Sequence, residues 1–146
     1  MLRIIETYGK LPNTYSIGKN VKYFLPGMIA QLFFHENADC NRLSCEVSGG
    51  LCSSGIIDDI KTDTEDSTKG TNRITVWVNK MVFVTDQFDM TKEYTKYAKL
   101  YCNNNGLFTT DEIVRQNYLK KDDDLLCGIV LEAPTALNPT LTALWL

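Results

Sequence analysis

Residues 73–88 read RITVWVNKMVFVTDQF, and this stretch decides the fold class. Every second residue from Ile74 to Val78 is apolar and β-branched, which is the period-2 pattern of a half-buried β-strand. The apolar run resumes at Met81–Val84, so two strands are expected. Asn79-Lys80 is the connecting pair, because Asn tolerates the left-handed backbone that a tight turn requires. The stretch therefore predicts a β-hairpin.

Turn residues on both sides of this hairpin mark further strands. Pro26-Gly27 interrupts the apolar block Val21–Phe34 and suits a type II turn, because Pro fixes φ and Gly supplies a positive φ. Downstream, Asn105-Gly106 predicts a second hairpin, between Lys99–Cys102 and residues 107–109. Short strands separated by turns are thus the dominant pattern.

A helix competes with this interpretation at one place. Met90, Tyr94, Tyr97 and Tyr101 have the i, i+4, i+7, i+11 spacing that would put all four on one helical face. The strand and turn residues that follow favour the hairpin, which leaves room for at most one helical turn before it.

The remaining segments complete an all-β pattern. Gly55–Ile60 and Leu125–Glu132 are predicted strands, and the Leu144-Trp145-Leu146 end is expected to pair as a strand, since leaving such side chains in water costs roughly 1.5–3 kcal/mol each. His35–Ser54 is expected to be a long loop or a loosely ordered hairpin, 61–72 a solvated loop, and 111–124 a polar excursion. We predict a small antiparallel β-barrel or β-sandwich with long loops and little helix. Residues 1–20 would form an N-terminal strand or arm, and 21–146 a single barrel-like domain.

Composition excludes several classes of protein. The 146 residues are 44% hydrophobic and 23% charged, enough to bury a core, so disorder is not expected. The formal charge of −3 argues against binding to nucleic-acid phosphates, and no apolar run approaches the roughly 18 residues of a membrane span. Residues 1–6 lack the apolar stretch of a secretory signal, so we expect a reducing compartment, with Cys102 and Cys127 as small buried apolar side chains.

The other three cysteines form a cluster downstream of the single histidine. His35, Cys40, Cys45 and Cys52 are separated by four, four and six residues, without the close pair typical of zinc sites. The alternatives are free thiols, a disulfide within the cluster and a zinc site, and free thiols are the default in a reducing compartment. We expect no metal here.

Candidates for catalysis are few. Asp58 and Asp59 are adjacent in a predicted strand, so they would point to opposite faces and would not flank one bond together. The Asp122-Asp123-Asp124 run lacks the glycine and distal glutamate of a calcium loop, and Ser48-Gly49-Gly50 is followed by no helix that would make it a phosphate loop. A nucleophile pair would have to combine His35, in a loop, with one of the cysteines. We therefore expect neither an enzyme nor a bound cofactor.

Aromatic residues are numerous in the predicted strands. They are interpreted as core, because no basic residues alternate with them as they would in a platform that stacks on bases. Some of this apolar surface can be covered by neighbouring subunits, which fits a protein that assembles. The residues concerned are Tyr23, Phe24, Leu25, Phe33, Phe34, Trp77 and Trp145.

The order of these segments resembles a known class of protein. From about Val21 to the end, the chain is similar in layout to small virion structural proteins of tailed bacteriophages, above all to the lambda-type head decoration (cement) proteins. The segments that carry the resemblance are Tyr23–Leu32, Gly55–Ile60, Ile74–Val78, Val82–Phe88, Lys99–Tyr101, Asn105–Leu107, Gly128–Val130 and Leu144–Leu146. The cysteine-containing loop from Cys40 to Cys52 and the acidic excursion near Asp122 depart from that layout.

The resemblance implies a partner and no catalytic residue. The partner is the lattice of the major capsid protein, or another virion protein, and the chain would be a homo-oligomer, a trimer, in virions assembled in the host cytoplasm. An N-terminal arm around Leu2–Ile5 can add a strand to a neighbouring subunit. The alternatives are a tail, baseplate or head–tail connector protein, and a free ligand-binding β-barrel with a concave aromatic pocket.

Overall fold

A computed structural model describes the backbone of residues 1–9, 12–17, 25–37, 40–47, 53–61, 73–112, 114–115 and 123–146. These ranges contain strands and turns and no helix, so the prediction of an all-β fold with little helix is confirmed. The strands are β1 (Leu2–Thr7), β2 (Asn13–Ile17), β3 (Ile29–Asn37), β4 (Cys40–Val47), β5 (Gly55–Lys61), β6 (Arg73–Trp77), β7 (Met81–Thr85), β8 (Lys99–Cys102), β9 (Phe108–Thr109), β10 (Val114–Arg115), β11 (Asp123–Asp124), β12 (Gly128–Glu132) and β13 (Leu141–Trp145).

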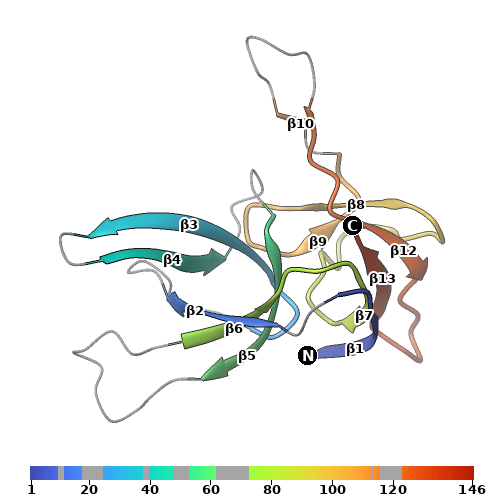
Figure 1. The fold of residues 1–146 in the computed structure, drawn as a ribbon. Coiled ribbons are helices and arrows are strands. Elements are labelled where there is room, and N and C mark those ends of the chain that lie inside the picture. Colours follow the sequence, from blue (N-terminus) through green and yellow to red (C-terminus); the bar gives the residue numbers. More distant parts are fainter. Residues whose placement is uncertain are drawn as a thin grey trace.

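The strands form two main bodies that lie side by side (Figure 1). β2, β4, β3, β5 and β6 are hydrogen-bonded in a closed ring, with one parallel pair, β2–β4. The other body is an open six-stranded sheet of order β1-β7-β13-β12-β8-β9. The first body is thus a small barrel, whereas the second stays open. Residues 1–20, expected as a strand or arm, contribute β1 to the sheet and β2 to the barrel.

The 73–88 stretch forms both expected strands but not the expected hairpin. β6 pairs with β2 and β5 in the barrel, whereas β7 pairs with β1 and β13 in the sheet. Among the described residues other than glycine, only Tyr97 has a positive φ, so Asn79 does not take the left-handed conformation of a tight hairpin turn. Residues 78–80 instead carry the chain from one body to the other.

Two other turns are as the sequence predicts. Gly27 has φ +95°, and the amide of Met28 donates a 3.1 Å hydrogen bond to the carbonyl of Leu25, which closes the Pro26-Gly27 turn. Gly106 has φ 76°, and β8 and β9 pair as the predicted hairpin. Both glycines supply a backbone conformation that other residues adopt at a cost.

The His35–Ser54 region is more regular than a loop. β3 continues to Asn37 and pairs along its length with β4, in a register that runs from Ala30↔Val47 to Asn37↔Cys40. A hairpin is therefore the correct alternative of the two that the sequence left open. Asn and Ser, which usually favour turns, occupy paired strand positions in this hairpin. Their presence therefore made the region look like a loop in the sequence.

Helical spacing at Met90, Tyr94, Tyr97 and Tyr101 does not produce a helix. The segment contains isolated turns, closed by hydrogen bonds from the Lys92 amide to the Asp89 carbonyl and from the Ala98 amide to the Thr95 carbonyl. Tyr101 is buried in β8, whereas Tyr97 is exposed. The four side chains thus share no face.

A single hydrophobic core connects the sheet and the barrel. Phe83, Phe108 and Trp145 lie at its centre, with ring centroids 5.2 Å apart for Phe83–Phe108 and 6.2 Å for Phe108–Trp145. Ile29 and Ile56 join it from the barrel, and both are fully buried. The terminal strand β13 lies between β7 and β12 with Trp145 only 3% exposed, which confirms the expected pairing of the chain end.

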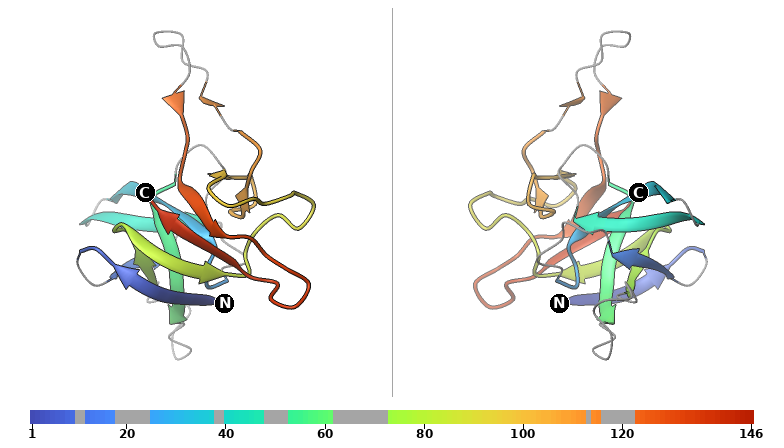
Figure 2. Two further views of the ribbon diagram at one scale, coloured as in Figure 1. Left: turned by 90° about the vertical axis from the view of Figure 1, so that its right-hand side faces the viewer. Right: turned by 90° about the vertical axis from the view of Figure 1, so that its left-hand side faces the viewer.

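The pair β10–β11 projects away from both bodies, as the three views of Figures 1 and 2 show. It lies within the excursion predicted for 111–124. The opposite end of the sheet, at the loops 86–98 and 133–140, is fully described and holds the site considered next.

Candidate functional site

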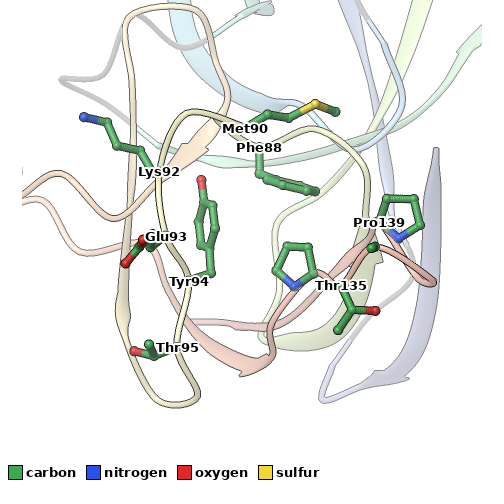
Figure 3. Close-up of a pocket in the computed structure, with 10 residues that line it drawn as sticks. Phe88, Met90, Lys92, Glu93, Tyr94, Thr95, Thr135 and Pro139 are labelled. Atoms are coloured by element: carbon green, nitrogen blue, oxygen red, sulfur yellow. The ribbon is translucent and has the colours of Figure 1, made fainter.

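A cleft of about 490 Å³ opens between two loops at this end of the sheet. One loop joins β7 to β8 and the other joins β12 to β13, and their side chains face each other across the cleft (Figure 3). The lining residues are Phe88, Met90, Lys92, Glu93, Tyr94, Thr95, Pro134, Thr135, Ala136 and Pro139. Apolar and polar groups contribute almost equally to this lining.

Two aromatic rings form the wall on the side of the first loop. Phe88 is buried, and its ring meets that of half-buried Tyr94 edge-on, with 5.3 Å between the centroids. The Tyr94 hydroxyl lies 2.8 Å from the carbonyl oxygen of Asp89 and 3.0 Å from that of Phe108, and it donates its proton to these acceptors. Burial, with a smaller contribution from the charge of Asp89, raises the pKa of Tyr94 well above its usual value, so its ring stays neutral.

The first loop is held by hydrogen bonds around Asp89. The Asp89 carboxylate accepts from the hydroxyl of Thr91 at 2.6 Å and from its amide at 3.0 Å, an arrangement that lowers the pKa of Asp89. Lys92 forms a 2.8 Å ion pair with Asp111, and the hydrogen bond to that carboxylate raises the pKa of Lys92. The charged groups of Asp89 and Lys92 are therefore already paired within the chain.

The second loop is closed by its own hydrogen bonds. The Thr135 amide donates to the Asn138 carbonyl at 2.9 Å, and the Asn138 amide donates to the Thr135 hydroxyl at 3.0 Å. The Thr140 hydroxyl donates to the Asn138 side chain at 2.8 Å, and Pro134 and Pro139 restrict φ on both sides. Leu137 lies in the middle of this loop and is almost fully exposed.

Sequence reasoning did not find this cleft. Its walls lie about 45 positions apart in the chain and belong to connections, so no periodicity relates them. The only local signals were Ala133-Pro134 and Asn138-Pro139, which mark ends of strands and not a binding surface.

The cluster of His35 and three cysteines, for which the sequence left free thiols, a disulfide and a zinc site as alternatives, lies mostly outside what the structure describes. His35 is in β3, with Cys40 and Cys45 in β4, where Cys40 pairs with Asn37 and Cys45 with Leu32. Their side chains and all of Cys52 lie outside the described residues, so the three alternatives for this cluster stay predictions. Within the described part of the chain, no group of three or more His, Cys, Asp or Glu side chains is placed to hold a metal.

The backbone places the remaining aspartate candidates on two different strands, β5 and β11. Asp58 and Asp59 lie in β5 where its register against β6 shifts, between Ile57 and Ile60. Asp123 and Asp124 form β11, and Asp122 lies outside the described residues. No helix among the described residues is long and apolar enough to cross a membrane.

Cys102 and Cys127 are buried, as predicted. Burial raises the pKa of the Cys127 thiol far above its usual value, with a further contribution from Cys102 nearby. Cys127 is therefore protonated at neutral pH, which is the unreactive form of a thiol.

Comparison with known proteins adds no relative: no protein-family model, no curated protein and no solved structure matches this chain.

Proposed function

We propose that this protein is a structural component of a tailed-bacteriophage virion, a homotrimeric decoration protein that stabilises the head by bridging capsid subunits. It acts through its surfaces and carries out no catalysis. A protein that binds the assembled lattice better than free subunits shifts the equilibrium toward the intact particle by mass action.

The observation that carries the proposal is the position of β1. β1 is an edge strand of the six-stranded sheet, and among the described strands it pairs only with β7. Its inner residues Leu2 and Ile4 pack against the core, while Ile5 is 55% exposed. An edge strand offers backbone donors and acceptors to a strand of a neighbouring protein, so β1 can dock by strand addition.

The anchoring of β1 supports this use. The α-amino group of Met1 donates to the carbonyl of Pro26 at 3.0 Å and to the carboxylate of Asp86 at 2.5 Å. β1 is thus held in place before it meets a partner, which lowers the entropy lost on docking. Many weak contacts of this kind add up on a lattice, because the lattice presents many copies at once.

The test uses the phage genome that encodes this chain. Deleting the gene should give heads that lose DNA on mild heating, and adding the purified protein back should restore their stability and decorate the heads in electron micrographs. Decoration of the tail or baseplate would favour the alternative virion location. Particles that never bind the protein would overturn the proposal.

A matched pair of variants tests the role of β1. Ile5→Lys places a charge on the exposed edge, a change that blocks strand addition in natural edge strands. Leu25→Lys makes the same change at a residue that is similarly exposed but lies outside the strand. Ile5→Lys should bind heads weakly, whereas Leu25→Lys should bind as the wild type does. Equal binding by both would exclude β1 as the docking strand.

A further inference from the structure

The cleft between the 86–98 and 133–140 loops has the size of a small-molecule site. Its volume of about 490 Å³ lies within the range of roughly 300–1,000 Å³ in which proteins bind small ligands. Its lining is almost equally apolar and polar. A ligand that fits this lining needs an apolar face and polar groups at its edge, because burying polar side chains against a purely apolar ligand costs free energy.

The charges around the cleft argue against an ion as its ligand. Lys92 is the only cation among the described lining residues, and its ammonium already pairs with Asp111 at 2.8 Å. Glu93 adds a negative charge to the lining, and the net charge of −3 also repels an anion such as phosphate. A metal ion finds no group of three or more His, Cys, Asp or Glu side chains in the described part of the chain. The ligand expected here is therefore neutral.

An aromatic ring lies at the centre of the cleft. Figure 3 shows the ring of Tyr94 between Glu93 and Thr95 on one side and Thr135 on the other. The ring is half-buried, and its hydroxyl is fixed by two backbone carbonyl oxygens at 2.8 Å and 3.0 Å. A ring held in this way offers its electron-rich face to the C–H groups of a ligand, and little entropy is lost on binding.

Polar groups that can bond to hydroxyls flank this ring. The hydroxyl oxygen of Thr135 accepts from the Asn138 amide, which leaves its proton to donate to a ligand. The carboxylate of Glu93 has no hydrogen-bond or ion-pair partner among the described residues, so it can accept from a ligand. Thr95 is exposed beside it and brings a hydroxyl of its own. Both donors and acceptors are thus available around the Tyr94 ring.

We propose that the cleft binds a neutral saccharide. A sugar ring has an apolar face of C–H groups and an edge of hydroxyls, which matches an aromatic ring flanked by polar side chains. The apolar face would stack on Tyr94, and the hydroxyls at the edge would bond to Thr135 and Glu93. The inference goes beyond the proposed function and does not depend on it. If both hold, the virion carries a surface that recognises carbohydrate.

Backbone strain in the same loop is a second observation that points to a ligand. Tyr97 has φ 68°, a conformation that costs free energy for a residue other than glycine. Its side chain is 69% exposed, so burial in the core does not offset that cost. Strain of this kind gathers at ligand sites, where the conformation serves binding. The 86–98 loop therefore has a feature that folding alone does not explain.

The test titrates the full-length ¹⁵N-labelled protein with lactose, maltotriose and N,N′-diacetylchitobiose, each followed by amide chemical shifts up to about 50 mM. At least one of these sugars should shift the amides of Tyr94, Thr95, Thr135 and Ala136 in a saturable way, with a dissociation constant on the order of 1 mM. Sorbitol has hydroxyls but no ring with an apolar face, so it should shift none of them. If none of the three sugars shifts these amides, or if sorbitol shifts them equally, the inference is wrong.

Two variants of Tyr94 separate stacking from folding. Tyr94→Phe and Tyr94→Leu both lose the hydrogen bonds of the hydroxyl, but only Tyr94→Leu loses the ring. Tyr94→Leu should bind the sugar at least about 5-fold more weakly than Tyr94→Phe does. Equal affinities would contradict stacking on Tyr94. Thermal melting and the amide spectrum verify that each variant is folded.

Variants at exposed residues keep the inference testable if Tyr94→Leu does not fold. Ala136→Phe fills the cleft from the second loop and should abolish binding. Glu93→Gln removes the charge of an acceptor and should weaken binding by about 5-fold, whereas Glu6→Gln, at an exposed glutamate of β1, should bind as the wild type does. Wild-type affinity in Ala136→Phe would overturn the inference. These titrations use no phage particles, so their failure is distinct from a failure to bind heads.

Discussion

The hydroxyl of Thr85, in the sheet, donates a 3.2 Å hydrogen bond to the carbonyl of Gly27, in the turn that leads into the barrel. The same hydroxyl accepts a 3.0 Å hydrogen bond from the amide of Gln87. Thr85 is fully buried, so one side chain joins the two bodies where water cannot replace it.

Thr85→Val should therefore destabilise the protein by about 1–3 kcal/mol, because it leaves a carbonyl and an amide without their buried partner while it conserves volume. Urea unfolding measures the change. Thr85→Ser keeps the hydroxyl and should lose less than Thr85→Val does. If Val is tolerated as well as Ser, the hydrogen bonds contribute little and the contact is one of packing alone.

Gly27→Ala should also destabilise the protein. With φ at +95°, a side chain at this position is strained, and a Cβ would lie 2.6 Å from the backbone carbonyl oxygen of Met1 and would also clash with Thr85. We expect a loss of roughly 1–3 kcal/mol from the backbone strain alone. Introduced into a Thr85→Ala background, Gly27→Ala should still destabilise the protein in thermal melts, since φ and the contact with the Met1 carbonyl are unchanged. If Gly27→Ala costs nothing when compared with Thr85→Ala alone, the clash with the Thr85 hydroxyl, and not the conformation, was the cause.

The sequence predicted the strands better than their partners. The alternation in residues 73–88 locates β6 and β7, because period-2 burial is a local property. It does not reveal that β6 closes the barrel and β7 joins β1 and β13, because these pairings depend on residues far along the chain. The hydrophobic surface that each strand buries selects its partner, and no local pattern encodes that choice.

The cleft was even harder to predict from the sequence than the strand pairing. Phe88 and Pro139 line the same cleft because Phe88 follows β7, Pro139 precedes β13, and these two strands are neighbours in the sheet. The sequence did not predict that the two strands are neighbours. Tyr94 and Tyr97 have helical spacing, but the positive φ of Tyr97 prevents a helix there. Loops that meet through a sheet become predictable only once the strand order is known.

Cys102 and Cys127 should resist alkylation in the folded protein. Both thiols are at most 3% exposed, they lie 3.2 Å and 3.3 Å from the carbonyl oxygens of Asn103 and Leu100, and the raised pKa of Cys127 keeps it protonated. Iodoacetamide at pH 8 followed by peptide mass spectrometry should find both unmodified until denaturant is added. Rapid labelling of Cys127 in the native protein would show that the chain opens at the start of β12. The Cys127 thiol would then not stay buried in solution.

Acid should loosen β1 through Asp86. Partial burial raises the pKa of this carboxyl, but the hydrogen bonds from the Met1 amine and from Gln87, together with the charge of the amine, outweigh burial and lower it. The unfolded chain therefore binds a proton at a higher pH than the folded chain does, near the usual value of about 3.9. The stabilisation is present above that value and is lost as the pH falls through the lower pKa of the folded state.

Asp86→Asn tests this directly, since it keeps the shape of the side chain but removes its charge. The variant should be less stable than the wild type at pH 7, and the difference should shrink as the pH falls to about 3, below the unfolded pKa. Hydrogen exchange of the β1 amides at both pH values locates the effect, because fraying of β1 should accompany it. A difference in stability that is constant with pH would show that the Met1–Asp86 contact is held by hydrogen bonding without help from charge.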